Sequence, residues 1–338
     1  MALKDIVRNI QDAPKVKSLS EVIDNFIVQR ESKPNDHSYG WHPSSFCDMC
    51  IRHKVISDIV EEKKANNFSE KLYRIFDVGS SLHRWYQEEY LGPSGILWGK
   101  WRCSRCHMYV WGFMPSIKCS CEESQRTPLC LKFCTDFSRS SSSSEATYLP
   151  EKMQNRGGCV HCGKWGKWEF REVPFRLDAE GLSEPILGHC DGVLILPSGV
   201  LLEAKTINSF GFAGLFAPRR AHVLQGQAYA ELLRRKAVPG CTRPLPEAKK
   251  ILIFYIGKNT SDEKEFWIDV DRDVGSAVLE IPFQVEAAHK SKTLPDKHSE
   301  CEEDEKCRRV KKCSVKKFCF AKRVSYKSLT LYGEKYGR

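Results

Sequence analysis

The residues most able to do chemistry lie in two neighbouring apolar segments of the chain. Asp191 follows His189 in the first segment, and Glu203 and Lys205 stand two residues apart in the second. Because side chains alternate across a strand, Glu203 and Lys205 should share one face, and His189 and Asp191 should share a face of the neighbouring strand. Acids and a lysine inside apolar strands are costly unless they are paired or bind a metal. The two carboxylates therefore predict a site for Mg²⁺ or Mn²⁺, which prefer oxygen ligands.

A cation held by Asp191 and Glu203 would suit phosphoryl chemistry. It would activate a water molecule and stabilise charge on a phosphoryl group during in-line displacement. Lys205 could position that water or neutralise charge at phosphorus. The alternative is an exposed hairpin in which an acid and the lysine form an ordinary ion pair, so companion residues must decide between the two interpretations.

Two pairs of residues at helical spacing supply such companions. Gly79 and His83 are four residues apart, so in a helix they face the same side. The glycine would let that helix approach a sheet closely, and the imidazole could then reach a metal. Gln225 and Tyr229 have the same spacing and could contact a DNA phosphate or base. The alternatives are a histidine satisfied within the core, and a helix with a buried tyrosine and an exposed glutamine.

Apolar patterning predicts the elements that position these residues. Continuous or alternating apolar runs indicate strands, and apolar residues three or four apart indicate helices. The predicted strands cover residues 186–196, 199–207, 250–256 and 265–270, with a turn at Pro197-Ser198-Gly199 and apolar strands resuming at Phe175; the predicted helices begin at a capping box at Ser18 and at Pro43, and cover residues 69–90, 222–235 and 274–288.

The chain has 338 residues, 41% of them hydrophobic, which is enough for one large domain with insertions or for two domains. Its net charge of +10 favours a polyanionic partner such as DNA or RNA over plain solubility charge. No apolar run approaches the ~18 residues that span a membrane, and residues 1–20 do not have the pattern of a secretory signal. Clustered cysteines in a reducing compartment favour metal binding over a secreted disulfide scaffold.

Two of the cysteine pairs have the spacing of metal-binding knuckles. Cys103 with Cys106, and Cys159 with Cys162, are Cys-x-x-Cys pairs of the kind that bind zinc in a ribbon. The gap between them contains a serine-rich low-complexity loop at residues 138–144. Other candidate ligands in this segment are Cys119, Cys121, Cys130 and Cys134, as a second zinc site, and His107 and His161, as substitutes for a thiolate. The surrounding tryptophans, Trp98, Trp101, Trp111, Trp165 and Trp168, fit the small core of a ribbon better than they fit stacking on unpaired bases.

Four motifs follow one another in the order found in the RecB-type PD-(D/E)xK nucleases, which the chain resembles. It is also similar to the branch of that family with an iron–sulfur cluster, which includes the AddB nuclease domain and the CRISPR-associated RecB-like exonucleases. The resemblance covers the chain except residues 99–170, and the four motifs are specific only jointly. They are Gly79-x-x-x-His83, His189-x-Asp191, Glu203-x-Lys205 and Gln225-x-x-x-Tyr229.

The resemblance implies a role for each motif around one Mg²⁺ or Mn²⁺ ion. The implied metal ligands are His83, Asp191, Glu203 and the carbonyl of Ala204; the implied catalytic lysine is Lys205; Gln225 and Tyr229 would support DNA binding and geometry; and His189 is an extra residue without an assigned role.

The resemblance also implies that a cysteine cluster joins the two ends of the chain. From Cys301 onward the cysteines recur every six residues, whereas the family's downstream trio begins with a tighter pair, and Cys47 competes with the upstream cysteine. The choice of four ligands, and that between [4Fe–4S] and zinc, therefore stay open, as does a disordered basic tail with idle cysteines. Thiolates bound to one centre would clip both ends of the chain across the fold. The implied ligands are Cys50, Cys307, Cys313 and Cys319.

These features together predict an α/β, restriction-endonuclease-like fold with a mixed central sheet flanked by helices. Its parts would be residues 1–98 (N-terminal helical part), 99–170 (zinc-ribbon-like insertion), 171–292 (nuclease core) and 293–338 (basic, cysteine-rich segment completing the cluster). The predicted function is a metal-dependent DNA exonuclease on single strands or DNA ends in recombination, repair or replication. The alternatives are a structure-specific endonuclease or spacer-processing nuclease, and a non-cutting, zinc-stabilised nucleic-acid-binding protein. By analogy with freestanding phage relatives, we expect the cytoplasm of a bacterium or phage-infected cell, without a membrane partner.

Overall fold

The computed structural model describes residues 26–27, 39–60, 69–115, 156–159, 161–162, 165–196, 199–241, 243–303, 306–322 and 324–336. The chain divides into two compact units, Met1–Ser38 with Ala65–Val78, and Tyr39–Lys64 with Gly79–Arg338. Every described candidate site residue belongs to the second unit. Some predictions lie outside the described residues: the capping box at Ser18, the loop at 138–144, and the second zinc site at Cys119, Cys121, Cys130 and Cys134.

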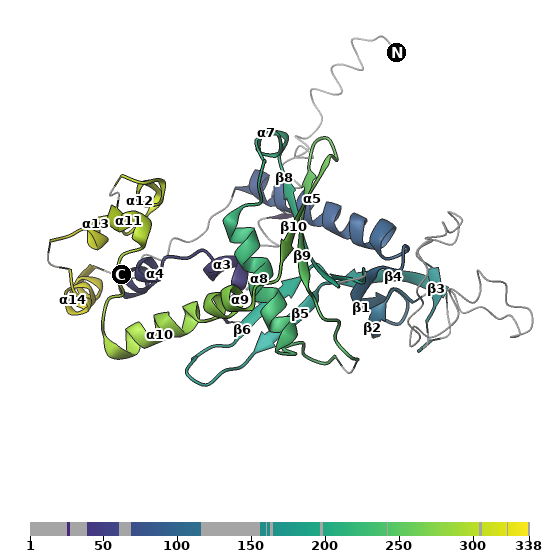
Figure 1. Ribbon diagram of the computed structural model, residues 1–338, viewed down its shortest axis with the longest axis horizontal. Helices are drawn as coiled ribbons and strands as arrows, with labels where there is room; N and C mark the ends of the chain where they lie inside the picture. The colour runs from purple at the N-terminus through teal and green to yellow at the C-terminus, as the bar shows by residue number, and fades with distance from the viewer. Residues whose placement is uncertain are drawn as a thin grey trace, which may run out of the picture. The chain divides into compact units, whose positions relative to one another are not determined.

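A mixed, mostly antiparallel eight-stranded sheet forms the centre of the second unit (Figure 1). Its order is β10-β9-β8-β7-β1-β4-β3, and β2 pairs with β1. Among these described strands only β8 and β9 pair in parallel. A separate antiparallel hairpin consists of β5 and β6. The strands are β1 (Leu97–Cys103), β2 (Tyr109–Phe113), β3 (Arg156–Gly158), β4 (Trp165–Arg171), β5 (Val173–Leu177), β6 (Ile186–Cys190), β7 (Val193–Leu194), β8 (Val200–Ile207), β9 (Lys250–Gly257) and β10 (Glu263–Asp269).

Helices flank this sheet, so the fold is mixed α/β, as predicted at that level. The chain crosses from β8 to β9 through α8, because parallel neighbours need a long crossover. This helix packs on β8 and β9 and on the β5–β6 hairpin. The helices are α3 (Pro43–Phe46), α4 (Ile51–Ile59), α5 (Glu70–Trp85), the π-helical η1 (Tyr86–Leu91), α7 (Ser209–Ala213), α8 (Arg220–Arg234), α9 (Arg272–Leu279), α10 (Ile281–Ser291), α11 (Ser299–Glu303), α12 (Arg308–Lys312), α13 (Lys316–Cys319) and α14 (Tyr326–Tyr336).

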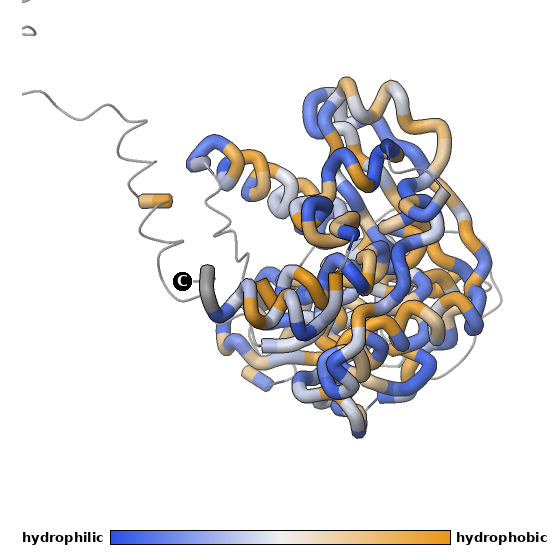
Figure 2. The backbone as a smooth tube through the Cα atoms, turned by 90° about the vertical axis from the view of Figure 1, so that its left-hand side faces the viewer, coloured by the Kyte–Doolittle hydropathy of each residue, from blue (hydrophilic) through white to orange (hydrophobic). Residues whose placement is uncertain are grey.

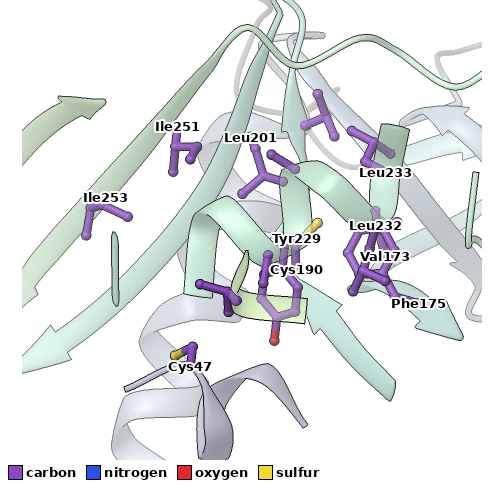
Figure 3. Close-up of a cluster of buried hydrophobic side chains, with 14 of the residues drawn as sticks. Cys47, Val173, Phe175, Cys190, Leu201, Tyr229, Leu232, Leu233, Ile251 and Ile253 are labelled. Carbon is purple, nitrogen blue, oxygen red and sulfur yellow. The ribbon is translucent and has the colours of Figure 1, made fainter. Parts of the chain in front are cut away.

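The main hydrophobic core lies where α8 meets the strands. Figure 3 shows Tyr229 and Leu232 of α8 beside Val173, Phe175 and Cys190 of the β5–β6 hairpin, all within one buried cluster. Hydrophobic and hydrophilic segments alternate along the backbone (Figure 2), as expected for elements buried on one face. Strand β9 departs from this pattern, because all its residues from Ile251 onward are buried.

The predicted strand at residues 186–196 is wrong in one respect that matters for the site. The chain leaves β6 after Cys190 and enters β7 at Val193, and the two strands belong to different sheets. Gly192, between them, has φ +131°, a backbone conformation that L side chains rarely adopt. Asp191 therefore lies at a break between strands rather than inside one.

Most other predicted elements are confirmed. The helix expected at 69–90 is α5 continued by the π-helical η1, which periodicity did not indicate, and the helix at 222–235 is α8. The helix expected at 274–288 is two helices, with Pro282 in the first turn of the second. Among the described residues, no helix has both the length and the apolar character needed to cross a membrane.

Candidate active site and metal centres

Asp191 is buried between a strand and a helix that both hold it in place. Only 6% of the surface of Asp191 is exposed to solvent. The backbone N–H of Ala204, on β8, donates to Oδ2 at 2.8 Å. Gln87, in η1, donates through Nε2 to the Asp191 carbonyl at 3.0 Å and reaches Oδ1 at 3.4 Å. These donors fix the orientation of the carboxylate before any ligand binds.

His83 reaches the same carboxylate from α5. Its Nδ1 lies 3.5 Å from Oδ1 of Asp191. Burial acts to lower the pKa of His83, but the hydrogen bond and charge of Asp191 outweigh it and raise the pKa above its usual value. Gly79 makes this approach possible, since a Cβ there would lie 2.8 Å from Oγ1 of Thr206 on β8. The predicted close approach of this helix to the sheet is thus confirmed.

Glu203 and Lys205 project from the same face of β8, as the alternation predicted. Glu203 is 2% exposed, and its Oε1 lies 2.5 Å from Nζ of Lys205. Its Oε2 is buried without a hydrogen-bond partner. Burial, opposed by Lys205 and reinforced by Asp191, raises the pKa of Glu203 to about 7. Burial alone would lower the pKa of Lys205, but Glu203 raises it above the ordinary value, so the ammonium stays charged.

The three side chains predicted to bind the cation, His83, Asp191 and Glu203, are therefore neighbours, but they do not form a compact group of metal ligands. His83 contacts Asp191, and the charges of Asp191 and His83 both act on Glu203. Among the described residues, the closest group of candidate metal ligands is a set of four cysteines rather than these three side chains. The Glu203 carboxylate is instead turned toward Lys205, which leaves its second oxygen unpartnered.

An open cleft of about 460 Å³ adjoins this group, with His83 and Gln87 in its wall. It also contains Glu172, an acid that the sequence reasoning missed. Desolvation and the negative charge of Asp191 raise the pKa of Glu172 to about 7. The Glu172 side chain itself is exposed to solvent.

His189 lines the same cleft, but it does not share a strand face with Asp191. The strand ends at Cys190, so alternation no longer relates the two residues. His189 is exposed while Asp191 is buried. Burial of part of the ring and the nearby His42 and Lys100 lower the pKa of His189, which keeps the imidazole neutral.

Gln225 and Tyr229 share a face of α8, as predicted, but that face is turned into the protein. Nε2 of Gln225 donates to the hydroxyl of Tyr229 at 3.1 Å, and both residues are buried. The Tyr229 ring stacks on Phe175, with centroids 5.5 Å apart (Figure 3). Their burial favours a supporting role in positioning β6 over direct contact with DNA.

The two Cys-x-x-Cys pairs meet in space as the sequence predicted. Cys103 ends β1 and Cys159 follows β3, and both strands border β4. All four ligand sulfurs lie within 4.8 Å of one another, with Sγ of Cys106 3.6 Å from Sγ of Cys159. A tetrahedral zinc with Zn–S bonds of about 2.3 Å places its sulfurs about 3.8 Å apart. The sulfur spacing therefore fits a four-thiolate metal centre.

The surroundings of this centre also suit a metal. The N–H of Arg105 donates to Sγ of Cys103 at 3.4 Å. Burial acts to raise the pKa of Cys159, but the N–H groups of Cys162 and His161 lower it to about 7. Trp101 and Trp168 are fully buried against these cysteines, which confirms their predicted role as core residues. The cysteine group thus packs against the buried tryptophans of the adjoining strands.

A second group of cysteines joins segments far apart in sequence. Cys50, at the start of α4, lines a cavity of about 450 Å³ together with Cys301, Cys313 and Cys319. Sγ of Cys307 accepts from the N–H of Val310 at 3.4 Å. Burial and the neighbouring Cys307 and Cys50 raise the pKa of Cys301 to about 11. Cys301 is thus a fifth candidate beside the four implied ligands.

Cys47 does not belong to this group. Its Sγ donates to the carbonyl of Ala221 at 3.2 Å, and the side chain lies in the main core. Burial raises the pKa of this thiol to about 12, so it is a packing residue and no competitor of Cys50. The cavity itself is bordered by Arg308, Arg309 and Lys312, whose charges suit a cluster of thiolates.

Neither Gln87 nor Glu172 belongs to the motifs that predicted the site. Gln87 is four residues beyond His83 and eight beyond Gly79, so helical spacing could have placed it on the face turned to the sheet. Glu172 carried no such signal, because the single residue between β4 and β5 belongs to no periodic pattern.

Comparisons with known proteins give no family for this chain. No protein-family model matches it, and no curated protein matches it significantly. The chain is similar to a solved structure titled "Crystal structure of SSO0001", with 12% identity, a TM-score of 0.39, and coverage of 90% of this chain and 98% of that one. A likeness at this level supports no conclusion about fold or activity.

Proposed function

We propose that this protein is a Mg²⁺- or Mn²⁺-dependent DNA nuclease of the RecB-type PD-(D/E)xK kind, with a restriction-endonuclease-like core. The observation that carries the proposal is the pre-oriented Asp191 carboxylate, held by Ala204 and contacted by His83, with Glu203 and Lys205 on the adjoining strand. Two buried acids whose charges act on a histidine and a lysine beside a cleft are candidates for a catalytic site.

The residues present fit a divalent cation. Oε2 of Glu203 is a buried oxygen without a partner, and a cation is the kind of ligand that satisfies such an atom. Asp191, Glu203 and His83 would hold the ion, with the Ala204 carbonyl as the further ligand that the resemblance implies. When bound, the ion supplies an activated water and charge stabilisation at phosphorus.

The chain's own groups supply the rest of the reaction. Lys205 stays protonated beside Glu203, so its ammonium can hold the attacking water and stabilise negative charge on the phosphate oxygens. Gln87 and the Ala204 N–H keep Asp191 from rotating away from the substrate. Glu172 lines the same cleft and is a further acid that can exchange a proton with water there.

The cysteine group at the chain ends supports the iron–sulfur branch of that family. Four cysteines line one cavity of about 450 Å³ that is bordered by basic side chains, which suits a [4Fe–4S] cluster; a zinc ion would require their sulfurs to move closer together. Cys50, Cys313 and Cys319 would bind it, with Cys307 or Cys301 as the fourth ligand. Such a centre would fasten α4 to the C-terminal helices.

Cleavage of end-labelled single-stranded DNA with Mn²⁺ tests the proposal. We expect Asp191→Asn to abolish cleavage, because the substitution keeps the shape but removes the metal-binding charge. Asp269→Asn is the matched control, since Asp269 is an exposed acid on β10. Binding without cleavage by the wild type would indicate the non-cutting alternative, and cleavage of closed circular strands would indicate an endonuclease.

A further inference from the structure

The π-helical turn η1 contacts both the candidate active site and a strand that borders the four-thiolate centre. Gln87 donates to the backbone carbonyl of Asp191 and reaches its Oδ1. The next residue, Glu88, is only 3% exposed and binds β4 instead. The N–H of Gly92 donates to the carbonyl of Gln87 at 2.8 Å, which is the hydrogen bond of a π-helix, and such turns often mark functional sites.

Both carboxylate oxygens of Glu88 are used to bind β4. Oε1 accepts from the N–H of Phe170 at 3.1 Å, and Oε2 lies 3.1 Å from Nζ of Lys167. Phe170 lies beyond the part of β4 that pairs with β3, so the side chain of Glu88 takes the place of a strand neighbour there. Because charge-assisted hydrogen bonds are strong and directional, this carboxylate fixes the distance between η1 and β4.

The same part of β4 also contacts the strands that carry the cysteines. Trp168 pairs with Cys103 of β1, and the carbonyl of Lys167 accepts from the N–H of Ser104 at 3.0 Å. On its other side β4 pairs with β3, which Cys159 follows. A metal bound to these cysteines would therefore hold β4 from both sides, and through Glu88 it would also hold η1.

A second set of contacts joins η1 to this region. Tyr86 and Leu91, the first and last residues of η1, pack against the buried cluster that contains Cys103 and Cys159. A Cβ at Gly92 would lie 2.5 Å from Cη2 of Trp101, a buried member of the same cluster. The turn η1 thus rests on the strands that carry the cysteines, and a rearrangement of these strands would move Gln87.

We propose that Glu88 is a positioning residue that couples the four-thiolate centre to Asp191, so that zinc bound by the cysteines holds the Asp191 carboxylate in the orientation that a divalent cation needs. The inference rests on the proposed function in taking Asp191 as a cation ligand, but the coupling itself requires no cleavage of DNA. Loss of zinc would release β4 and η1, and the Asp191 carboxylate would then turn more easily from the N–H of Ala204. The cysteine centre is thereby a zinc-sensitive control of the candidate active site, with two distinct sites linked through one packed turn.

Hydrogen exchange at the Ala204 N–H measures this coupling without DNA, because that N–H donates to Asp191. The rate is followed by NMR in zinc-free protein and after addition of an equimolar amount of zinc. Removal of zinc should speed this exchange by about 5-fold or more, which is within the scale of coupling that packed networks carry. Exchange in α10 is the internal control, because a general loosening of the protein would speed it as well.

The affinity for Mn²⁺ gives an independent measurement of the same coupling. The dissociation constant is determined by electron paramagnetic resonance of the free ion, and the relevant site is the one that Asp191→Asn abolishes. We expect this constant to rise by about 5-fold or more when zinc is removed from the wild type.

Two variants should break the coupling from opposite sides. Glu88→Gln keeps the shape of the side chain but offers one acceptor oxygen where the carboxylate offers two, and Lys167→Gln removes the ammonium from a side chain that is 50% exposed. In both variants zinc removal should change Ala204 exchange by less than about 2-fold, the range expected of independent sites. Glu89→Gln is the matched control and should keep the full zinc effect, because Glu89 lies 3.2 Å from the same lysine but its side chain is 37% exposed.

The outcomes separate the coupling from the proposed function. Equal Ala204 exchange in zinc-free and zinc-loaded wild type overturns the coupling, and so does a full zinc effect in both Glu88→Gln and Lys167→Gln. A zinc effect on Ala204 that these variants abolish, in a protein that neither binds Mn²⁺ at Asp191 nor cuts DNA, supports the coupling and overturns the nuclease. Mn²⁺-dependent cleavage by a wild type without a zinc effect overturns the coupling alone.

Discussion

Replacing Cys159 by serine tests the four-thiolate centre most directly. Its ligand sulfurs lie within 4.8 Å of one another. The distance of 3.6 Å between Sγ of Cys106 and Sγ of Cys159 is close to the sulfur–sulfur distance of about 3.8 Å in a tetrahedral zinc site with four thiolates. We therefore expect about one zinc ion per chain at this site. Cys159→Ser should lower the zinc content by about one ion per chain, because serine is a poor ligand for zinc.

The change in zinc content should be accompanied by a loss of stability. Cys159 is 2% exposed and packs in a cluster with Trp101 and Trp168, so a metal bound here would join the end of β1 to the end of β3 around a tryptophan core. Structural zinc contributes folding free energy directly, on the order of 10 kcal/mol in zinc-finger peptides, and part of it should be lost here. Thermal unfolding followed by tryptophan fluorescence should show a transition that shifts downward and responds to chelators.

Zinc is measured by plasma mass spectrometry on protein purified without added metal, and Co²⁺ substitution reports tetrahedral thiolate ligation through its visible absorption. Cys241→Ser is the control, because Cys241 donates to the Arg243 carbonyl and lies apart from both cysteine groups. Unchanged zinc content in Cys159→Ser and in Cys106→Ser would refute the reasoning, and so would a disulfide between the two pairs in freshly prepared protein.

Three further substitutions test other parts of the structure. Hydrogen bonds from Arg234 and Arg235 hold the pKa of Glu231 at about 2, below its ordinary 4.5, so the stabilisation that Glu231 contributes is present above pH 4.5 and disappears as the pH falls toward 2. Glu231→Gln should therefore lower the free energy of unfolding by about 1–2 kcal/mol at pH 7, a value reduced because the arginines are exposed. Near pH 2 the substitution should leave the free energy of unfolding unchanged, and urea titrations at the two pH values measure both effects. Gly226→Ala would place a methyl 2.7 Å from a buried isoleucine of β9, so overpacking of about 1–3 kcal/mol should exceed the gain in helix propensity of about 1 kcal/mol; Gly214→Ala, with no atom within 4 Å, should be neutral in the same titration. Gln87→Leu should reduce the rate of single-stranded DNA cleavage about 10-fold or more, because it removes the side-chain donor to Asp191.

Much of this fold could be predicted from periodicity, because its central elements are regular. Strand β8 and its parallel partner β9 are apolar runs, and α8 between them has a clear helical pattern. The contact between two Cys-x-x-Cys pairs could also be predicted despite the long gap in sequence, since metal-ligand spacing is a local signal. The π-helical turn at Tyr86–Leu91 could not, because it depends on how the helix meets the sheet.

The site was harder to predict than the elements that carry it. The motif residues His83, Asp191, Glu203 and Lys205 meet, but the strand break at Gly192 separates Asp191 from His189. Alternation along a strand could not show this break, because it assumes a continuous extended chain. The position of the break depends on which distant strands pair with each other, and a local sequence pattern does not contain that information.

Glu203 carries a cost in stability near neutral pH, because its carboxyl is buried. The folded state binds the Glu203 proton more tightly than the unfolded chain does, with a pKa of about 7 against 4.5. As pH rises through that interval, the unfolded state loses the proton first, so stability falls and the folded protein must hold a buried charge. Lys205 neutralises one carboxylate oxygen, and the other stays without a partner. Under the proposed function, a divalent cation shared with Asp191 would satisfy this free oxygen and offset the cost of the buried charge.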